Sequence, residues 1–325
     1  MKPNRLTLMT EIDPLLEGLN PQQSEAVTHA GGPLLVVAGA GSGKTRVLTR
    51  RIAYLMSRRN VAPYQILAIT FTNKAAGEMK ERVADLVGPI AKSMWVSTFH
   101  SACVRILRQE ATRLGYSNSF SIYDSADSQR LITIVAKELN LDAKRYPARQ
   151  FQSMISNAKN ELLGPQDYLN AASNPFEQIV ADVYAVYQQR LIRANAMDFD
   201  DLILKTVEVL QRYPEAKARF RSRFRHVLVD EYQDTNHAQY ILVKELVGTE
   251  LEGQAPAELC VVGDADQSIY GFRGATIRNI LQFELDYPNA RTVLLEQNYR
   301  STQNILNAAN GIITKNESRK EKNLW

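Results

Sequence analysis

The 325-residue sequence has few cysteines, histidines and tryptophans: 2, 4 and 2 residues of these types. Two cysteines are too few for the disulfide scaffold of a small secreted domain. Cys103 and Cys260 each stand inside an apolar run, and neither has another Cys or His at metal-ligand spacing. We therefore interpret both as small buried hydrophobic residues and expect no zinc site.

Long hydrophobic runs are also missing. No apolar run approaches the roughly 18 residues of a membrane-spanning helix, and the first residues lack the continuous apolar core of a secretory signal. The charge is nearly balanced, because 39 Lys and Arg residues against 35 Asp and Glu residues give a net charge of +4. This positive excess is too small to indicate a nucleic-acid partner by itself. We expect a cytoplasmic protein with no membrane partner. At about 150 residues per domain, the length predicts two domains.

Continuous apolar runs rich in β-branched residues predict the buried strands of a parallel sheet. These runs are residues 34–38, 66–71, 94–99, 227–229, 259–262 and 292–295. Helix-like stretches, 44–56 and 75–86, follow the first two runs. Strands that alternate with helices predict an α/β fold with helices on both faces of the sheet. Between about residues 105 and 196 the apolar spacing is helical instead, which predicts an inserted all-helical subdomain.

A glycine-rich segment directly follows the first predicted strand. It consists of Gly39, Ala40, Gly41, Ser42, Gly43, Lys44 and Thr45. The segment ends in the Gly-Lys-Thr of a P-loop, although Ala38 stands where the stricter pattern has glycine. Backbone N–H groups of such a loop surround phosphate oxygens, Lys44 would reach the β- and γ-phosphates, and the Thr45 hydroxyl would hold Mg²⁺. The sequence therefore predicts a nucleotide site.

Acidic residues follow a later predicted strand, where a P-loop protein needs oxygen ligands for its metal. Asp230 would hold Mg²⁺, and the adjacent Glu231 could accept a proton from the attacking water. After the run 259–262, Gln267 could face the γ-phosphate from the carboxyl edge of the sheet.

Aromatic residues and an arginine come just after Gln267. Tyr270, Phe272 and Arg273 could stack on nucleic-acid bases, or they could pack this loop against the core. The residues alone leave both interpretations open.

In their order and spacing, these clusters resemble the motifs of the UvrD/PcrA/Rep group of superfamily 1 DNA helicases. The similar stretches are 19–23 (Q motif), 70–76 and 97–100 (motifs Ia and Ib), 198–202 (the next DNA-side element), 230–234 (motif II), 263–274 (motif III) and 297–301 (motif IV). The resemblance covers residues 19–301. It implies a RecA-like P-loop NTPase domain in which ATP and Mg²⁺ are bound.

The resemblance also implies roles for individual residues. Gln23 would read the adenine edge and Tyr299 would stack on the adenine. Arg46 would lie near the nucleotide, and Arg300 would contact the γ-phosphate. Single-stranded DNA would contact Phe71, Thr72, Asn73, Thr98, Phe99, His100, Phe199, Tyr270, Phe272 and Arg273. Phe272 replaces the tryptophan that is common in the family, but it still offers a ring for stacking.

By this resemblance the chain is the amino-terminal portion of an ATP-dependent 3′–5′ DNA helicase or single-stranded DNA translocase. We expect it to act in repair or replication, on single strands and single-strand/duplex junctions, together with repair or replication proteins. The expected domains are a RecA-like domain from 1–107 and 196–286, a helical insertion from 108–195, and the start of a second RecA-like domain from 287–325.

The family carries motifs V and VI on that second domain, and neither occurs in this sequence. A charged stretch that runs into Leu324 and Trp325 predicts that the chain continues. Two other interpretations stay open. The chain could be the motor part of a helicase–nuclease subunit, or a shortened chain that binds ATP and single-stranded DNA without moving.

Overall fold

A six-stranded parallel sheet forms the centre of the molecule in this computed structural model, which describes residues 13–249, 255–269, 271, 278–315 and 322–325. The strand order is β3-β2-β6-β7-β1-β8. The strands are β1 (Leu34–Ala38), β2 (Ile66–Thr70), β3 (Trp95–Thr98), β6 (His226–Val229), β7 (Glu258–Gly263) and β8 (Arg291–Leu295). Their ends lie within one residue of the predicted runs, which confirms the predicted parallel α/β sheet.

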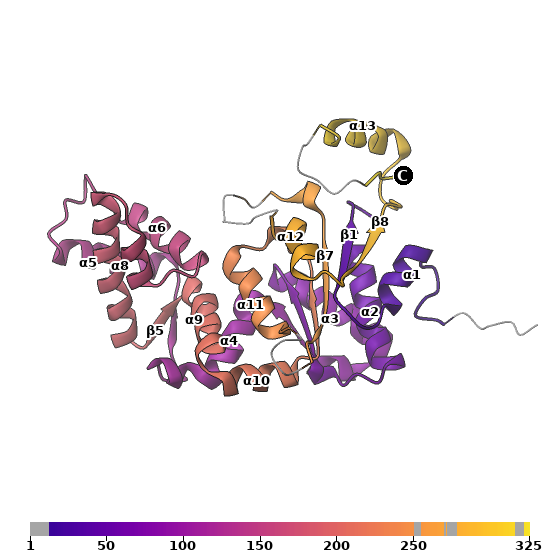
Figure 1. The fold of residues 1–325 in the computed structure, drawn as a ribbon, viewed down its shortest axis with the longest axis horizontal. Helices are drawn as coiled ribbons and strands as arrows, with labels where there is room; N and C mark the ends of the chain where they lie inside the picture. The colour runs from indigo at the N-terminus through magenta and orange to yellow at the C-terminus, as the bar shows by residue number, and fades with distance from the viewer. Residues whose placement is uncertain (1–12, 250–254, 270, 272–277, 316–321) are drawn as a thin grey trace, which may run out of the picture.

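Helices cover both faces of this sheet, which explains why apolar residues follow one another along the strands and do not alternate with polar ones. One face packs against α1 (Pro21–Thr28), α2 (Lys44–Arg58) and α3 (Asn73–Val87). The other packs against α4 (Phe99–Glu110), α9 (Phe199–Arg212), α10 (Pro214–Arg223), α11 (His237–Val247) and α12 (Arg278–Asp286) (Figure 1). In β1, Leu34 and Val36 belong to the first core, whereas Leu35 and Val37 belong to the second. Burial of each such side chain stabilises the fold by about 1.5–3 kcal/mol.

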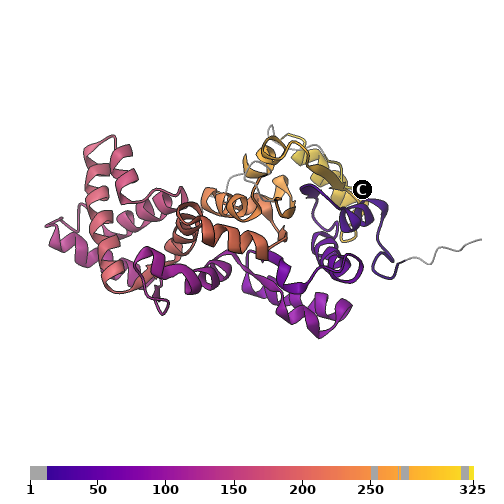
Figure 2. The ribbon, with the colours of Figure 1, turned by 60° about the horizontal axis from the view of Figure 1, so that its bottom comes forward.

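The insertion is a separate helical layer at one end of the molecule, and both views show it beside the sheet rather than over it (Figures 1 and 2). Its helices are α5 (Ser125–Glu138), α6 (Ala148–Asn160), α7 (Pro165–Ala171) and α8 (Pro175–Arg193), and they enclose a core of their own. It is not entirely helical, because β4 (Ser121–Tyr123) pairs in parallel with β5 (Ala196–Asp198). These strands have three residues each and lack an apolar run, so the sequence did not reveal them.

The last strand changes the expected domain boundary. β8 pairs with β1 along its whole length, from Leu34↔Arg291 to Ala38↔Leu295. Residues 291–295 therefore form an edge strand of the first sheet, and the boundary that we expected at residue 287 moves to the carboxyl side of this strand. Beyond it, α13 (Gln303–Ile313) lies past the carboxyl ends of β1 and β8 (Figure 1). None of the described helices is long and apolar enough to cross a membrane.

Candidate functional site

The glycine-rich loop joins the carboxyl end of β1 to the first turn of α2, as the P-loop pattern predicts. Gly41 and Gly43 have φ angles of 70° and 92°, which favour glycine. A side chain at Gly43 would also meet Gln23 Nε2 at 2.8 Å. No side chain caps the N-terminus of α2. Its first backbone N–H groups therefore point at the loop without a capping acceptor, an arrangement that suits an anion.

The acidic pair after β6 reaches this loop. Lys44 Nζ lies 2.7 Å from Glu231 Oε2. Asp230 is buried, and burial together with the charge of Glu231 raises its pKa to about 6, although Lys44 acts in the opposite direction. The Glu231 N–H donates to Asp230 Oδ1 at 3.0 Å. The predicted lysine and acids thus come together at the carboxyl edge of the sheet.

The donor set at this edge suits Mg²⁺. The Asp230 carboxylate is a hard oxygen ligand beside the P-loop, and Thr45, half-buried in the first turn of α2, supplies a hydroxyl. Among the described residues there is no group of three or more His, Cys, Asp or Glu that could hold a metal. Mg²⁺ is commonly held by one or two carboxylates with phosphate oxygens and water, so two protein oxygens are enough.

Gln267 lies at the same edge, after β7. Its Nε2 donates to Asp264 Oδ2, and Lys322 forms ion pairs with Asp264 and, at 3.1 Å, with Asp266. Burial and the charge of Lys44 lower the pKa of Lys322 to about 8. Sequence reasoning missed Lys322, because nothing in a charged stretch shows which lysine folds back onto this site. The contact between Gln267 and the γ-phosphate stays a prediction.

Residues of the Q motif and motif IV gather on the other side of the loop. Gln23 is fully buried, and its Nε2 donates to the Ser42 carbonyl at 2.9 Å. Tyr299 donates its N–H to the Gly41 carbonyl at 3.0 Å, while 53% of the residue is exposed.

The predicted arginines are also near the loop. A side chain at Gly41 would meet Arg300 Cβ at 2.8 Å, and a side chain at Gly43 would lie 3.9 Å from Arg46 Cβ. The four residues that the resemblance placed around the nucleotide, Gln23, Arg46, Tyr299 and Arg300, thus lie around the loop. Their contacts with ATP stay predictions.

The stretches that resemble motifs Ia and Ib follow β2 and β3. Thr72 and Thr98 cap the N-termini of α3 and α4, and Asn73 is the first residue of α3. The rings of Phe71 and Phe99 meet edge-on at 5.8 Å. Phe99 is only 2% exposed, so it supports Phe71 from within the core and has little ring surface left for a base. These helix N-termini can accept phosphates of a strand.

A cavity of about 450 Å³, which we call the groove, connects these motifs to the insertion. Its predicted lining includes Phe71, Thr72, Thr98, Phe99 and His100, and Phe199 borders it through a ring contact with His100 at 5.8 Å. Thr70, Asp200 and Asp234 also line it, and they belong to the stretches 70–76, 198–202 and 230–234 that the resemblance identified. The remaining lining residues were missed: Ser153, Ser156, Asn157, Asn160, Asn236 and Gln239. Four of these residues, Ser153, Ser156, Asn157 and Asn160, recur at helical spacing on α6, and this polar stripe can be recognised in the sequence. Tyr270, Phe272 and Arg273 lie outside the described residues.

One buried side chain connects the loop to the groove. Gln233 is 1% exposed, and its Nε2 donates to Glu231 Oε2 at 2.9 Å and to Asp234 Oδ2 at 3.2 Å. Its Oε1 accepts the Asp264 N–H at 2.9 Å. Glu231 belongs to the nucleotide side and Asp234 lines the groove, so the two sites share a hydrogen-bonded wall.

Comparison with known proteins agrees with this geometry. Residues 19–288 match the UvrD/REP helicase N-terminal domain family. The chain is 64% identical over 318 residues to the ATP-dependent DNA helicase UvrD1 of Mycobacterium tuberculosis, and 56% identical over 311 residues to the ATP-dependent DNA helicase PcrA of Bacillus subtilis. Each alignment covers 96% of this chain and 41% of the relative, so the chain spans about two fifths of these curated relatives.

A crystal structure of the Pif1 helicase from Candida albicans is a distant match, with a TM-score of 0.42 at 12% identity over 91% of this chain and 44% of that one. The family match covers most of the chain and includes the loop, the acidic pair and the groove. The chain therefore belongs to the UvrD/REP helicase family and carries its N-terminal domain.

Proposed function

We propose that this chain is the ATP-hydrolysing, strand-binding part of a 3′–5′ DNA helicase or translocase. The observation that carries the proposal is the contact of 2.7 Å between Lys44 and Glu231. The side chain of Gln233 connects this contact to the groove by hydrogen bonds. The names of the relatives support ATP as the hydrolysed nucleotide and DNA as the nucleic acid along which the protein moves.

In the proposed reaction, the N-terminus of α2 and Lys44 bind the phosphates. Bound Mg²⁺, held by Thr45 and Asp230, would neutralise developing negative charge on the phosphates. Contact with the phosphates draws Lys44 away from Glu231. The freed Glu231 carboxylate then accepts a proton from the attacking water.

The proposed track crosses the groove. Helix N-termini at α3 and α4 bind backbone phosphates, while Phe71 and Phe199 offer rings to the bases. Stacking tolerates any sequence, which suits a protein that moves along a strand. We further propose single-strand/duplex junctions as the preferred DNA, repair or replication proteins as partners, and the cytoplasm as the location.

We also propose a division of the chain into a RecA-like domain, the insertion (108–195) and the residues after β8, which begin a second domain. This division is supported by the separate apolar core of the insertion and by the edge position of β8.

ATPase activity with and without single-stranded DNA tests the proposal. Hydrolysis that increases on addition of a single strand and disappears in Lys44→Ala supports a DNA-dependent ATPase. DNA binding without any hydrolysis would instead favour a chain that binds ATP and single strands without moving.

A further inference from the structure

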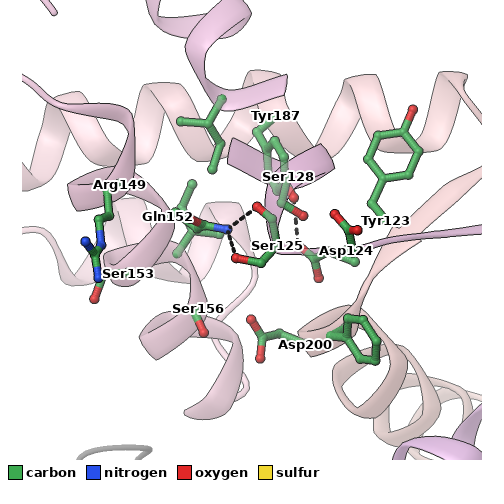
Figure 3. A pocket seen from close by; sticks show the side chains of 14 residues that line it. Tyr123, Asp124, Ser125, Ser128, Arg149, Gln152, Ser153, Ser156, Tyr187 and Asp200 are labelled. Atoms are coloured by element: carbon green, nitrogen blue, oxygen red, sulfur yellow. Dashed lines mark hydrogen bonds between the residues drawn. The ribbon is translucent and has the colours of Figure 1, made fainter. Parts of the chain in front are cut away.

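Two further cavities adjoin the sites described above. The first, of about 290 Å³, lies between α5, α6 and the start of α9 (Figure 3). Because Ser153, Ser156 and Asp200 line both this cavity and the groove, it is continuous with the groove. The second, of about 280 Å³, lies between the P-loop and α13, and Ala40 and Lys322 both line it. It therefore extends the nucleotide side of the molecule, and its wall includes a lysine that has no part in the mechanism proposed above.

The segment that lines the second cavity is held in place by its backbone. Residues 322–325, which we call the return segment, lie between α13 and the end of β8 (Figure 1). The Trp325 N–H donates to the Glu296 carbonyl at 3.1 Å, and the Trp325 carbonyl accepts the Asn298 N–H at 2.8 Å. These bonds continue the strand-like pairing past β8, so the return segment lies directly beside the stretch that resembles motif IV.

The return segment also contacts α13 and the P-loop. The Leu324 carbonyl accepts a hydrogen bond from Asn310 Nδ2 of α13 at 2.8 Å. A side chain at Gly39 would overlap the methyl groups of Leu324, so the leucine lies directly on the first glycine of the P-loop. The return segment therefore connects α13 to the phosphate-binding loop, and its side chains have fixed positions there.

Lys322 brings the positive charge of the return segment to two acids that follow β7. It forms ion pairs with Asp264 and, at 3.1 Å, with Asp266. The side chains of Lys322 and Asp264 are both 3% exposed, so water screens their interaction little. Lys44, the other lysine near this edge, is paired with Glu231. The compensation of the two acids therefore depends on Lys322.

Asp264 also holds the side chain that we expect at the γ-phosphate. Its Oδ2 accepts a hydrogen bond from Gln267 Nε2, while its Oδ1 accepts the Asp266 N–H at 3.0 Å and the Lys322 ammonium group. A carboxylate without a cation would bind the Gln267 amide more strongly, because hydrogen bonds to an uncompensated charge are the strong ones. It would also repel the oxygens of a triphosphate.

We propose that Lys322 is a positioning residue for recognition of the γ-phosphate: by neutralising Asp264 and Asp266, it lets Gln267 turn from Asp264 to the phosphate. The inference rests on the proposed ATP-hydrolysing function and adds to it a residue that helps the site to distinguish ATP from ADP. Lys322 itself stays on the two acids and acts through Gln267.

Nucleotide affinity tests this proposal, because ATP and ADP differ in the γ-phosphate. We expect Lys322→Met to lower the affinity for a fluorescent ATP analogue about tenfold, since a charged hydrogen-bonding partner is lost. The affinity for the matching ADP analogue should change little, because Gln267 would contact only the γ-phosphate. Lys322→Arg should keep the ATP affinity near that of the wild type, because its guanidinium group supplies the same charge.

The double variant Lys322→Met/Asp266→Asn separates charge from folding. It removes one negative charge together with the cation, so it should recover most of the ATP affinity that Lys322→Met loses. If the lysine only held the return segment in place, the second substitution would recover nothing. Lys315→Met, at an exposed position after α13, is the matched control and should bind both nucleotides as the wild type does.

Three results would overturn the role of Lys322. They are an unchanged ATP affinity in Lys322→Met, an equal loss of ATP and ADP affinity in that variant, and a double variant that recovers nothing. A wild-type chain that binds neither nucleotide would contradict the proposed function instead, so the two failures are distinguishable.

Discussion

Lys44 and Glu231 form an ion pair with each other, although the proposed mechanism needs both groups for other tasks. Their contact is 2.7 Å, but 37% of the Glu231 side chain is exposed. Water screens a pair of this kind, so it contributes little to the stability of the fold. In the proposed mechanism, the pair holds the Glu231 carboxylate beside the P-loop until phosphates replace it as the partner of Lys44.

We expect Glu231→Gln to keep ATP binding and to lower kcat by about a hundredfold or more, because a positioned general base contributes about 10²–10⁴ to the rate. Steady-state phosphate release gives kcat, and fluorescent-nucleotide titration gives the affinity. Glu78→Gln, at an exposed position of α3, should match the wild type. Undiminished turnover in Glu231→Gln would assign the base to another residue.

Gln233→Leu should uncouple DNA from hydrolysis. Gln233 contacts both Glu231 and Asp234, so its loss separates the nucleotide side from the groove. We expect stimulation of the ATPase by single-stranded DNA to fall more than the basal rate. The unfolding free energy should also fall by about 1–3 kcal/mol, because the buried Asp264 N–H loses its acceptor.

Gln178→Leu, at an exposed position of α8, is the control for the Gln233 variant and should leave both ATPase rates unchanged. An equal loss of basal and stimulated rates in Gln233→Leu would mean that Gln233 only supports the fold.

At the scale of elements, strands and the P-loop were predictable, whereas contacts between distant segments were not. Continuous apolar runs such as 34–38 mark buried strands, because both faces of a parallel sheet are covered. β4 is partly exposed and three residues long, so it has no such signature. The pairing of β8 with β1 joins residues about 250 positions apart in the sequence, and no local sequence pattern predicts it.

The same limit applies to the candidate site. Its P-loop and acidic pair have local sequence signatures, and these predicted Lys44, Asp230 and Glu231. The contacts of Lys322 and the Gln233 bridge join distant elements, so they became visible only in the folded chain. The polar residues of α6, in contrast, recur at helical spacing and could have been recognised in the sequence.

The junction between the insertion and α9 depends on a buried ion cluster. Lys159 of α6 is fully buried and lies 2.6 Å from Asp198 and 2.9 Å from Asp201. We expect Lys159→Met to lower the unfolding free energy by about 3–5 kcal/mol, because two buried carboxylates lose their cation. Urea denaturation followed by circular dichroism measures the change.

Lys205→Met is the matched control, since Lys205 pairs with Glu208 within α9 in a partly exposed position. Lys205→Met should lower the unfolding free energy by less than about 1 kcal/mol. A similar cost for the two lysine variants would refute the role given to the Lys159 cluster.

At the scale of the whole molecule, the stability of the sheet domain depends on pH through Glu258. Burial raises the pKa of this carboxyl, but the hydrogen bonds that Arg59 donates, together with His226 at 3.6 Å, outweigh burial and hold the pKa well below its ordinary value of 4.5. A group whose pKa is lower in the folded state stabilises the fold above its unfolded pKa and loses that contribution as the pH falls.

Glu258→Gln should therefore lower the unfolding free energy at neutral pH by about 2 kcal/mol. Its stability should also fall less steeply than that of the wild type between about pH 5 and pH 3. Urea denaturation at several pH values measures both the unfolding free energy at neutral pH and its change with pH. Glu161→Gln, at an exposed position, should give a curve parallel to that of the wild type. If the stability of Glu258→Gln falls with decreasing pH as steeply as that of the wild type, the pH dependence belongs to other carboxyls.

The edge strand β8 also has a mechanical consequence. When a force on the segment after Leu295 is directed along the strand axis, the hydrogen bonds between β8 and β1 bear the load together as a shear and do not open one at a time. β1 runs directly into the P-loop, and the Gly39 N–H donates to the Leu295 carbonyl at 3.2 Å. Tension on the carboxyl-terminal side of the chain is therefore delivered to the phosphate-binding backbone itself.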